Sequence, residues 1–268
     1  MVTGKHSGFP SGPPRGGMAD AHRRAAVAER AARAGGAVAR SSFREGIRVE
    51  TKADKNDPVT EADRDAQRQA VATVREEFPA DAVVGEEDGA VPVDADGNAE
   101  GEVLSSVPDG GDVWVVDPID GTANYARGGR LWATAVAAVV DRETVAAATY
   151  LPAVEDMYAA GPDGATRNGE SLSVSERSDP ETFAVAPVGR FPRDGAGRLG
   201  DVCRAVGAEL GDLRRYGSMQ ATLSFVAAGE LDAAFSPNRE HSWDTLAGVR
   251  LVRAAGGAVT DLSGDPWT

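Results

Sequence analysis

The most constraining feature of the chain is the segment Asp117-Pro-Ile-Asp-Gly-Thr-Ala-Asn-Tyr125, which directly follows the apolar run Val113–Val116. A short apolar run bounded by Pro and Gly predicts a buried strand, so two carboxylates emerge where that strand ends. Gly121 and Thr122 can then begin a helix, whose free N–H groups and positive dipole end attract anions. Hard cations such as Mg²⁺ prefer oxygen ligands and often retain phosphate oxygens. The segment therefore predicts a platform for metal and phosphate, although Asp-Pro and Asp-Gly pairs are also common turn formers.

Two further acidic motifs precede this segment, and each also has a purely structural explanation. Asp63 falls in the first turn of a helix expected over 61–78, where an acid caps the helix or is favoured by its dipole. The acidic run Glu86–Asp88 follows the apolar pair Val83-Val84, at the end of an expected strand, where functional groups are often presented. Acidic runs are, however, usually solvated loops.

A fourth acidic motif lies near the C-terminus, where Asp244 opens a helix expected over 243–255. The helix dipole would stabilise an acid at this position without any metal. The neighbouring Trp243 is large enough to hold the acid rigid by packing, as a metal ligand must be held.

Together the four motifs resemble those of the inositol monophosphatase family, the Mg²⁺-dependent, lithium-sensitive phosphatases that include archaeal fructose-1,6-bisphosphatases. The matching segments follow the family's order and are 57–63, Gly85–Glu87, Trp114–Tyr125 and Trp243–Gly248. The likeness runs from about Met18 to the C-terminus. It implies an α+β or α/β fold, a layered αβαβα sandwich of the inositol monophosphatase/fructose-1,6-bisphosphatase type.

The resemblance also implies a role for each site residue. The implied metal ligands are four carboxylates and one backbone carbonyl, from Glu86, Asp117, Ile119, Asp120 and Asp244. The implied catalytic residues are Thr122, Asp63 and Glu86, with Asp63 hydrogen-bonded to the Thr122 hydroxyl that takes a proton from water. The implied substrate contacts are Glu86, Ile119, Asp120, Gly121, Thr122, Gly217, Ser218, Met219 and Asp244. The implied cofactor is Mg²⁺, with two or three ions per site, and paired ions can activate water so that no protein nucleophile is needed.

The implied function is a phosphomonoesterase that uses metal-activated water to hydrolyse a sugar or polyol phosphate, such as inositol 1-phosphate and/or fructose 1,6-bisphosphate. A 3′(2′),5′-bisphosphate nucleotidase shares the same metal motifs. A non-catalytic Mg²⁺-binding regulatory protein is a further alternative, against which the retention of all the expected acids and Thr122 argues.

Substrate choice depends on the stretch before the Trp243-Asp244 pair. Inositol-specific relatives carry an acid there, and a gapless match places Pro237 at that position, with Glu240 or Asn238 as possible substitutes. Arginines could instead bind a second phosphate bidentately, although an exposed or salt-bridged arginine is the ordinary case. The candidate arginines are Arg214, Arg215 and Arg239.

The chain carries 42 acidic against 28 basic residues, a formal net charge of −14. Such a surface repels nucleic acid and anionic lipid, so neither polymeric nucleic acid nor a membrane is an expected partner. Only three lysines occur, Lys5, Lys52 and Lys55. Acid excess with scarce lysine predicts adaptation to concentrated salt, although a GC-rich genome also replaces Lys with Arg. Lys52 or Lys55 could point toward the metal site, as a lysine often does in the family, or lie in an exposed loop.

No run of 18 apolar residues occurs, so we expect a cytoplasmic protein, and homodimers are common in the family. We expect three parts along the chain: a disordered tail over 1–17, an α+β subdomain over 18–180 with most metal ligands, and a smaller α/β subdomain over 181–268. The last contributes Asp244 and substrate contacts. Met18 is a candidate for the first residue of the native protein. Relatives continue past the final Gly-Gly-Ala segment by a strand and a helix, so a C-terminal truncation is also expected.

Periodicity predicts the main elements. Helices are expected over 19–40, 61–78, 196–210, 218–229 and 243–255. Strands with hairpin-like antiparallel pairing are expected over 112–117, 131–140, 145–151 and near 157–160, with short apolar segments at 183–188 and 231–235. The acidic stretch between Glu87 and Asp112 is expected to be a mobile surface loop. Cys203 shares an apolar stripe with Val206, which predicts a buried structural thiol. His241 is the only histidine expected near the site.

Overall fold

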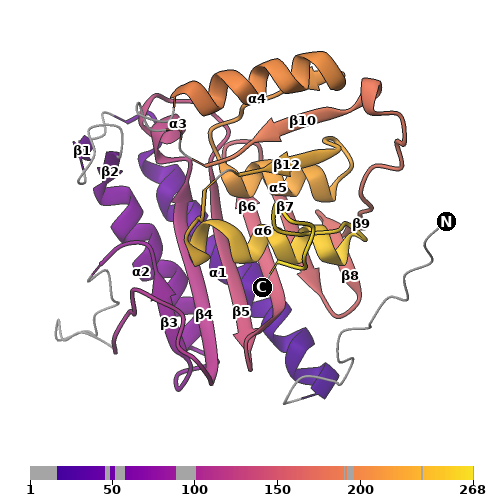
Figure 1. Ribbon diagram of the computed structural model, residues 1–268. Coiled ribbons are helices and arrows are strands. Elements are labelled where there is room, and N and C mark those ends of the chain that lie inside the picture. The colour runs from indigo at the N-terminus through magenta and orange to yellow at the C-terminus, as the bar shows by residue number, and fades with distance from the viewer. Residues whose placement is uncertain are drawn as a thin grey trace.

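A seven-stranded sheet forms the centre of the molecule (Figure 1). The computed structural model describes residues 17–45, 49–51, 58–88, 101–189, 191, 196–236 and 238–267. In spatial order the strands are β3 (Ala82–Gly85), β4 (Asp112–Asp120), β5 (Ala133–Val140), β6 (Glu143–Leu151), β7 (Asp156–Gly161), β8 (Gly164–Arg167) and β9 (Glu170–Ser171). β3 pairs with β4 in parallel, and the other neighbours are antiparallel. β4 to β6 are buried on both faces along most of their length, and β5 and the middle of β6 are nearly continuous Val and Ala, so other layers must cover both sides.

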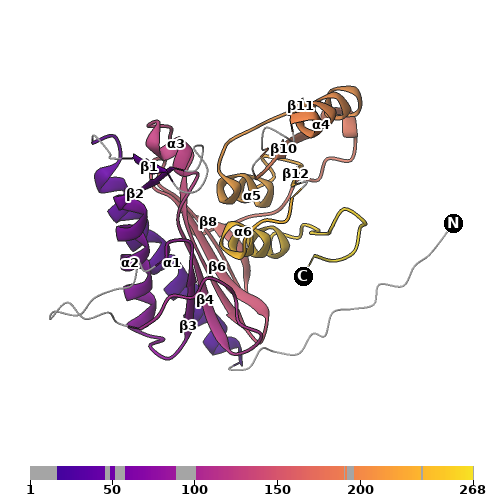
Figure 2. The same cartoon turned by 60° about the vertical axis from the view of Figure 1, so that its left-hand side comes forward.

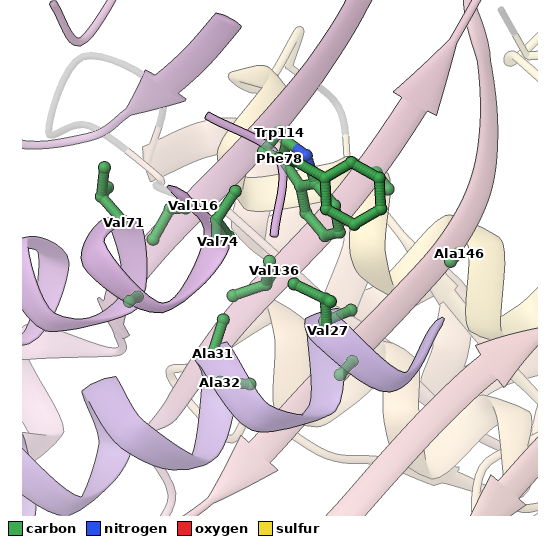
Figure 3. Close-up of a cluster of buried hydrophobic side chains, with 14 of the residues drawn as sticks. Val27, Ala31, Ala32, Val71, Val74, Phe78, Trp114, Val116, Val136 and Ala146 are labelled. Atoms are coloured by element: carbon green, nitrogen blue, oxygen red, sulfur yellow. The ribbon is translucent and has the colours of Figure 1, made fainter. Parts of the chain in front are cut away.

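Two helices, α1 (Gly17–Ser42) and α2 (Glu61–Arg75), cover one face of this sheet (Figure 2). The buried residues of α1 are mainly Ala, Gly and Val, which allows a close approach. A Cβ at Gly35 would lie 2.9 Å from the Ala66 carbonyl oxygen, so this contact between the helices requires glycine. Figure 3 shows the apolar cluster beneath the helices, which includes Val27, Val71, Phe78 and Trp114.

A buried arginine, Arg24 of α1, ties this helix layer to the sheet. Its guanidinium donates to the carboxylates of Asp20, Asp81 and Asp112 at 2.8, 2.6 and 2.6 Å, and it stacks over the ring of Phe78. Charged partners satisfy the buried cation, so breaking one pair would leave an uncompensated charge. Nothing in the sequence pattern indicated this network, because Arg24 and Asp112 lie 88 residues apart.

The opposite face of the large sheet carries α5 (Met219–Ala227) and α6 (Ser242–Ala254), and a second sheet lies beyond them (Figure 2). This smaller sheet is parallel, in the order β11 (Asp212–Leu213), β10 (Ala184–Pro187), β12 (Ala233–Phe235). α4 (Ala196–Glu209) lies on its outer side. The layers therefore run α, β, α, β, α, which confirms the expected αβαβα sandwich.

The remaining elements are short. β1 (Val49–Thr51) and β2 (Pro58–Thr60) pair in antiparallel fashion, α3 (Thr122–Ala126) follows β4, and a 3₁₀ turn covers Pro180–Thr182. Among the described helices, none combines the length and the apolar composition that a membrane crossing requires.

The expected helices and strands agree with the structure to within a few residues at each end. The prediction for Cys203 was wrong, because this thiol is exposed. α4 covers only a three-stranded sheet, so a narrow stripe that includes Val206 is buried, and Cys203 lies beside that stripe. The expected mobile loop is partly ordered, since the Leu104 N–H donates to the Val83 carbonyl at 2.7 Å. Residues 89–100 of that loop lie outside the described residues, as do residues 1–16 of the predicted tail, Lys52, Lys55 and Pro237. Residue 17, the last of the predicted tail, is instead the first residue of α1.

Candidate active site

Three carboxylates from two layers meet where β4 ends and α6 begins. Single oxygen atoms of Asp117, Asp120 and Asp244 all lie within 4.8 Å of one another. Asp117 and Asp120 are buried on β4, and Asp244 lies in the first turn of α6. Acids crowded at this spacing repel one another unless a cation or protons compensate the charge.

An irregularity in β4 explains how two acids of one strand reach the same cluster. Residues three apart on a regular strand face opposite sides of the sheet. The register between β4 and β5 shifts between Asp117 and Asp120, and the Thr134 hydroxyl holds the shifted segment by donating to the Pro118 carbonyl at 2.7 Å. The Ile119 side chain between the two acids is fully buried. The backbone itself therefore directs both carboxylates to one site.

Asp120 is held by the start of α5. Its carboxylate accepts the backbone N–H groups of Met219 at 3.1 Å and Gln220 at 2.7 Å, and the Ser218 hydroxyl in a short hydrogen bond. Gly121 permits this approach: its φ is +88°, and a Cβ there would lie 3.0 Å from the Cβ of Ser218. These contacts fix Asp120 relative to the layer that carries α5 and α6.

Asp117 differs from Asp120 in having no such support. Both of its carboxylate oxygens are buried, and neither has a hydrogen-bond partner among the described residues. A buried unpaired carboxylate is costly, so such groups are normally paired or coordinate a metal. An oxygen-rich set of this kind matches what Mg²⁺ requires of its ligands, so the residues present fit the ion that the sequence predicted.

The electrostatics of the cluster support the same interpretation. Burial, followed by the charges of Glu86, Asp120 and Asp244, raises the pKa of Asp117 well above its ordinary value. Burial raises the pKa of Asp120 to about 6, although the hydrogen bonds from the start of α5 oppose this change. Burial and the charges of Asp120 and Glu86 raise the pKa of Asp244 to about 8. Without a cation, the site therefore holds protons on these three acids more readily than solvent-exposed carboxyl groups do.

Glu86 lies in the loop after β3, and its carboxylate is not one of the three that meet within 4.8 Å of one another. Its N–H donates to the Val116 carbonyl at 3.3 Å, which places it beside the end of β4. The buried side chain of Gln67 fixes the next residue, because its amide bonds both the N–H and the carbonyl of Glu87, at 2.9 and 2.7 Å. A Cβ at Gly85 would come within 2.5 to 2.7 Å of the Gln67 amide, so this clamp requires glycine.

Thr122 and Asp63 meet as the sequence predicted, at the start of α3 and α2. The Thr122 hydroxyl lies 3.0 Å from the Ile119 carbonyl and 3.4 Å from Oδ1 of Asp63, which is buried. The hydroxyl has one proton to share between these two acceptors. α3 has only five residues, so its dipole is weaker than that of a full helix.

The structure also locates the other residues predicted to contact substrate. The donors of Ser218 and Met219 are used on Asp120, and Gly217 is exposed beside them. His241 is exposed and stacks on Trp243, with ring centroids 4.5 Å apart. Direct contact of these residues with a substrate stays a prediction.

The three arginines and the glutamate that are candidates for substrate binding lie beside the smaller sheet. Arg214 pairs with Asp212 at 2.5 Å, Arg215 lies over the ring of Phe191, and Arg239 is exposed. The Glu240 carboxylate accepts the Ser236 hydroxyl at 2.5 Å. These residues follow the carboxyl ends of β11 and β12, where open parallel sheets bind ligands.

Sequence reasoning missed three amides that organise the site. Gln67 holds the loop of Glu86, and the Gln220 side chain donates to the Trp243 carbonyl at 2.7 Å. The Asn124 side chain donates to the carbonyls of Leu131 and Tyr216 at 2.6 and 2.7 Å. Only Asn124 had a signal in the sequence, since it lies within the Asp117–Tyr125 segment. The glutamines lie on predicted helices, where their polar side chains would ordinarily face solvent.

The layered fold and the buried carboxylate cluster define an α+β protein with a group of oxygen ligands that could hold a metal ion. The model of the family described as "Inositol monophosphatase family" matches residues 20–268, and the chain belongs to this family of phosphatases. This confirms the resemblance seen in the motifs.

Individual relatives agree with this assignment. The chain is 38% identical to inositol-1-monophosphatase ImpA of Mycolicibacterium smegmatis, over 80% of this chain and 73% of that protein. It is 33% identical to the fructose-1,6-bisphosphatase/inositol-1-monophosphatase of Thermotoga maritima, over 81% and 76% of the two chains. The solved structure of a Thermotoga maritima IMPase superposes with a TM-score of 0.78 at 28% identity, covering 92% of this chain and 88% of that one.

Proposed function

We propose that the protein is a Mg²⁺-dependent phosphomonoesterase that hydrolyses a sugar or polyol phosphate, with inositol 1-phosphate and/or fructose 1,6-bisphosphate as the candidate substrates. The observation that carries the proposal is the buried carboxylate of Asp117, which has no hydrogen-bond partner in the part of the chain that the structure describes and has an oxygen within 4.8 Å of oxygens of Asp120 and Asp244. The names of the relatives include both activities, which supports the choice of substrates.

The proposed ligands for Mg²⁺ are the carboxylates of Glu86, Asp117, Asp120 and Asp244 and the carbonyl of Ile119. Bound Mg²⁺ would neutralise the charge of the phosphate ester and lower the pKa of the attacking water. The number of ions, two or three, is part of this proposal. The Asp120 carboxylate already accepts three hydrogen bonds, so its orientation is fixed before any ligand arrives.

Thr122 would handle the proton of the attacking water. Its hydroxyl can accept a proton from water while its own proton passes toward Oδ1 of Asp63, 3.4 Å away. Asp63 is buried, so the proton stays within the site rather than escaping to solvent. Positioned acid–base groups of this kind contribute rate factors of about 10² to 10⁴.

The phosphate would lie against the backbone N–H groups of Gly121 and Thr122, and the rest of the substrate against the smaller sheet. The loops after β11 and β12 supply groups for both candidate substrates. The Glu240 carboxylate could accept hydrogen bonds from sugar hydroxyls, whereas Arg215 or Arg239 could bind a second phosphate.

The test is phosphate release from a panel of esters, with and without Mg²⁺. Inositol 1-phosphate, fructose 1,6-bisphosphate and a 3′,5′-bisphosphate nucleotide would distinguish the candidate activities by kcat/KM. Asp117→Asn and Asp120→Asn should abolish release. Asp163→Asn is the matched control, because Asp163 is an exposed acid in the turn between β7 and β8. Equal release by wild type and both site variants would reject the enzyme proposal.

A further inference from the structure

Gln220 is a fully buried residue that joins the two segments presenting Asp120 and Asp244. Its backbone N–H donates to Oδ2 of Asp120 at 2.7 Å, and its side-chain Nε2 donates to the carbonyl of Trp243 at 2.7 Å. Trp243 directly precedes Asp244 in the first turn of α6. One residue therefore touches a carboxylate of β4 and the backbone next to a carboxylate of α6.

The Gln220 side chain is an expensive choice for a position that only fills space. Its Oε1 atom is buried and has no hydrogen-bond partner among the described residues. A buried acceptor without a partner is destabilising, whereas an apolar side chain of similar length would avoid this penalty. Reversing the amide would not help, because Oε1 would then face the Trp243 carbonyl. Packing alone therefore does not explain a glutamine here, and the bond to Trp243 is its distinguishing contact.

We propose that Gln220 is a positioning residue that sets the separation of Asp120 and Asp244 and thereby the affinity of the site for Mg²⁺. The inference rests on the proposed function. Holding the Trp243 carbonyl fixes the rotation of the first turn of α6, and this rotation determines where the Asp244 carboxylate points. Groups that orient metal ligands typically change metal affinity by about 10- to 100-fold when they are removed.

Gln220→Met tests the proposal, since methionine has a similar length and no N–H to donate. In the full-length chain, we expect calorimetric binding of Mg²⁺ to weaken by about 10- to 100-fold. The Mg²⁺ concentration for half-maximal phosphate release should rise in parallel, with the substrate KM at saturating Mg²⁺ unchanged. Without metal, the Tm of Gln220→Met should equal or exceed that of the wild type, because the variant lacks the buried Oε1 acceptor.

Thr149→Val is the matched control. Thr149 of β6 is also fully buried, and among the residues with described positions its hydroxyl has no hydrogen-bond partner, neither in the acid cluster nor in α6. This variant should raise the Tm and leave the Mg²⁺ affinity unchanged.

The outcomes separate the two proposals. Tight Mg²⁺ binding that is equal in wild type and Gln220→Met would overturn the role of Gln220, and so would a wild type that binds no Mg²⁺. If Gln220→Met does not fold, Gln220→Asn takes its place, because its shorter amide does not reach the Trp243 carbonyl; it should weaken Mg²⁺ binding in the same way. Failure of the wild type to release phosphate would reject the proposed function, while calorimetry would still test Gln220.

Discussion

Replacing Asp117 by asparagine should stabilise the metal-free protein while abolishing its activity. The Asp117 oxygens lack hydrogen-bond partners among the described residues, and one lies within 4.8 Å of an oxygen of Asp120 and of Asp244. Two unit charges at 4.8 Å with an effective dielectric constant of about 20 repel by about 3.5 kcal/mol. Burial adds to this repulsion: it is the main cause of the raised pKa of Asp120, about 6 against an ordinary 3.8, a change that corresponds to about 3 kcal/mol for one buried acid of the cluster.

The sign of the pH dependence follows from the raised pKa of Asp117. Between the pKa of the unfolded chain and that of the folded protein, the folded state binds more protons. The stability of the metal-free wild type therefore falls as pH rises through this window, and asparagine removes that loss. The advantage of Asp117→Asn should thus be larger at pH 8.5 than at pH 5.5. A gain of about 3.5 kcal/mol corresponds to an increase in Tm of about 10 °C.

The assay is thermal unfolding with a chelator and with Mg²⁺. Mg²⁺ at about 100 times its Kd should stabilise the wild type by about 2.7 kcal/mol and have little effect on Asp117→Asn. Asp81→Asn is the contrasting control: Asp81 accepts from Arg24 and Trp114, so its loss should cost about 3 kcal/mol. A metal-free Asp117→Asn protein that melts at or below the wild type at pH 8.5 would refute the account of the cluster.

Three further predictions concern the supports of the site. Thr122→Val should lower kcat by about 10²- to 10⁴-fold in a kinetic assay, while Mg²⁺ should still raise the Tm of the variant in a thermal assay. A variant that loses its activity and is no longer stabilised by Mg²⁺ would contradict a role in proton transfer alone. Gly121→Ala should lower the free energy of unfolding by about 2–4 kcal/mol, because backbone strain at φ +88° adds to contacts at 3.0 Å. Gly169 has a φ of +87° but no atom within 4 Å of an added Cβ, so Gly169→Ala should show the cost of backbone strain alone. Equal denaturant midpoints for Gly121→Ala and Gly169→Ala would show that the close contacts at Gly121 add no cost. Gln67→Leu should raise the Mg²⁺ concentration for half-maximal activity by about 10- to 100-fold, and an unchanged activation curve would show that the clamp on Glu87 does not position Glu86.

The sequence predicted the acids of the site because each belongs to a local motif. Asp117 and Asp120 follow an apolar strand within one short segment, and Asp244 opens a helix beside Trp243. Alternation and helical spacing also predicted the main strands and helices, since burial on one face or two leaves a direct mark on the chain.

Contacts between distant segments could not be predicted in this way. The Arg24 network and the two buried glutamines depend on which helices lie together, and no local pattern records this. The error at Cys203 has a related cause, because helical spacing does not show how wide a stripe the neighbouring sheet covers. The subdomain boundaries near residue 180, the salt adaptation, the cytoplasmic location and the possible homodimer stay predictions.

The shifted register of β4 means that the identity of the acids is only half of what builds the cluster. Transplanting Asp117 and Asp120 into a flat, regular strand of another protein would send one carboxylate to each side of that sheet. A designer who wished to graft this centre would have to copy the offset itself, with Pro118 and the Thr134 hydroxyl that secures it.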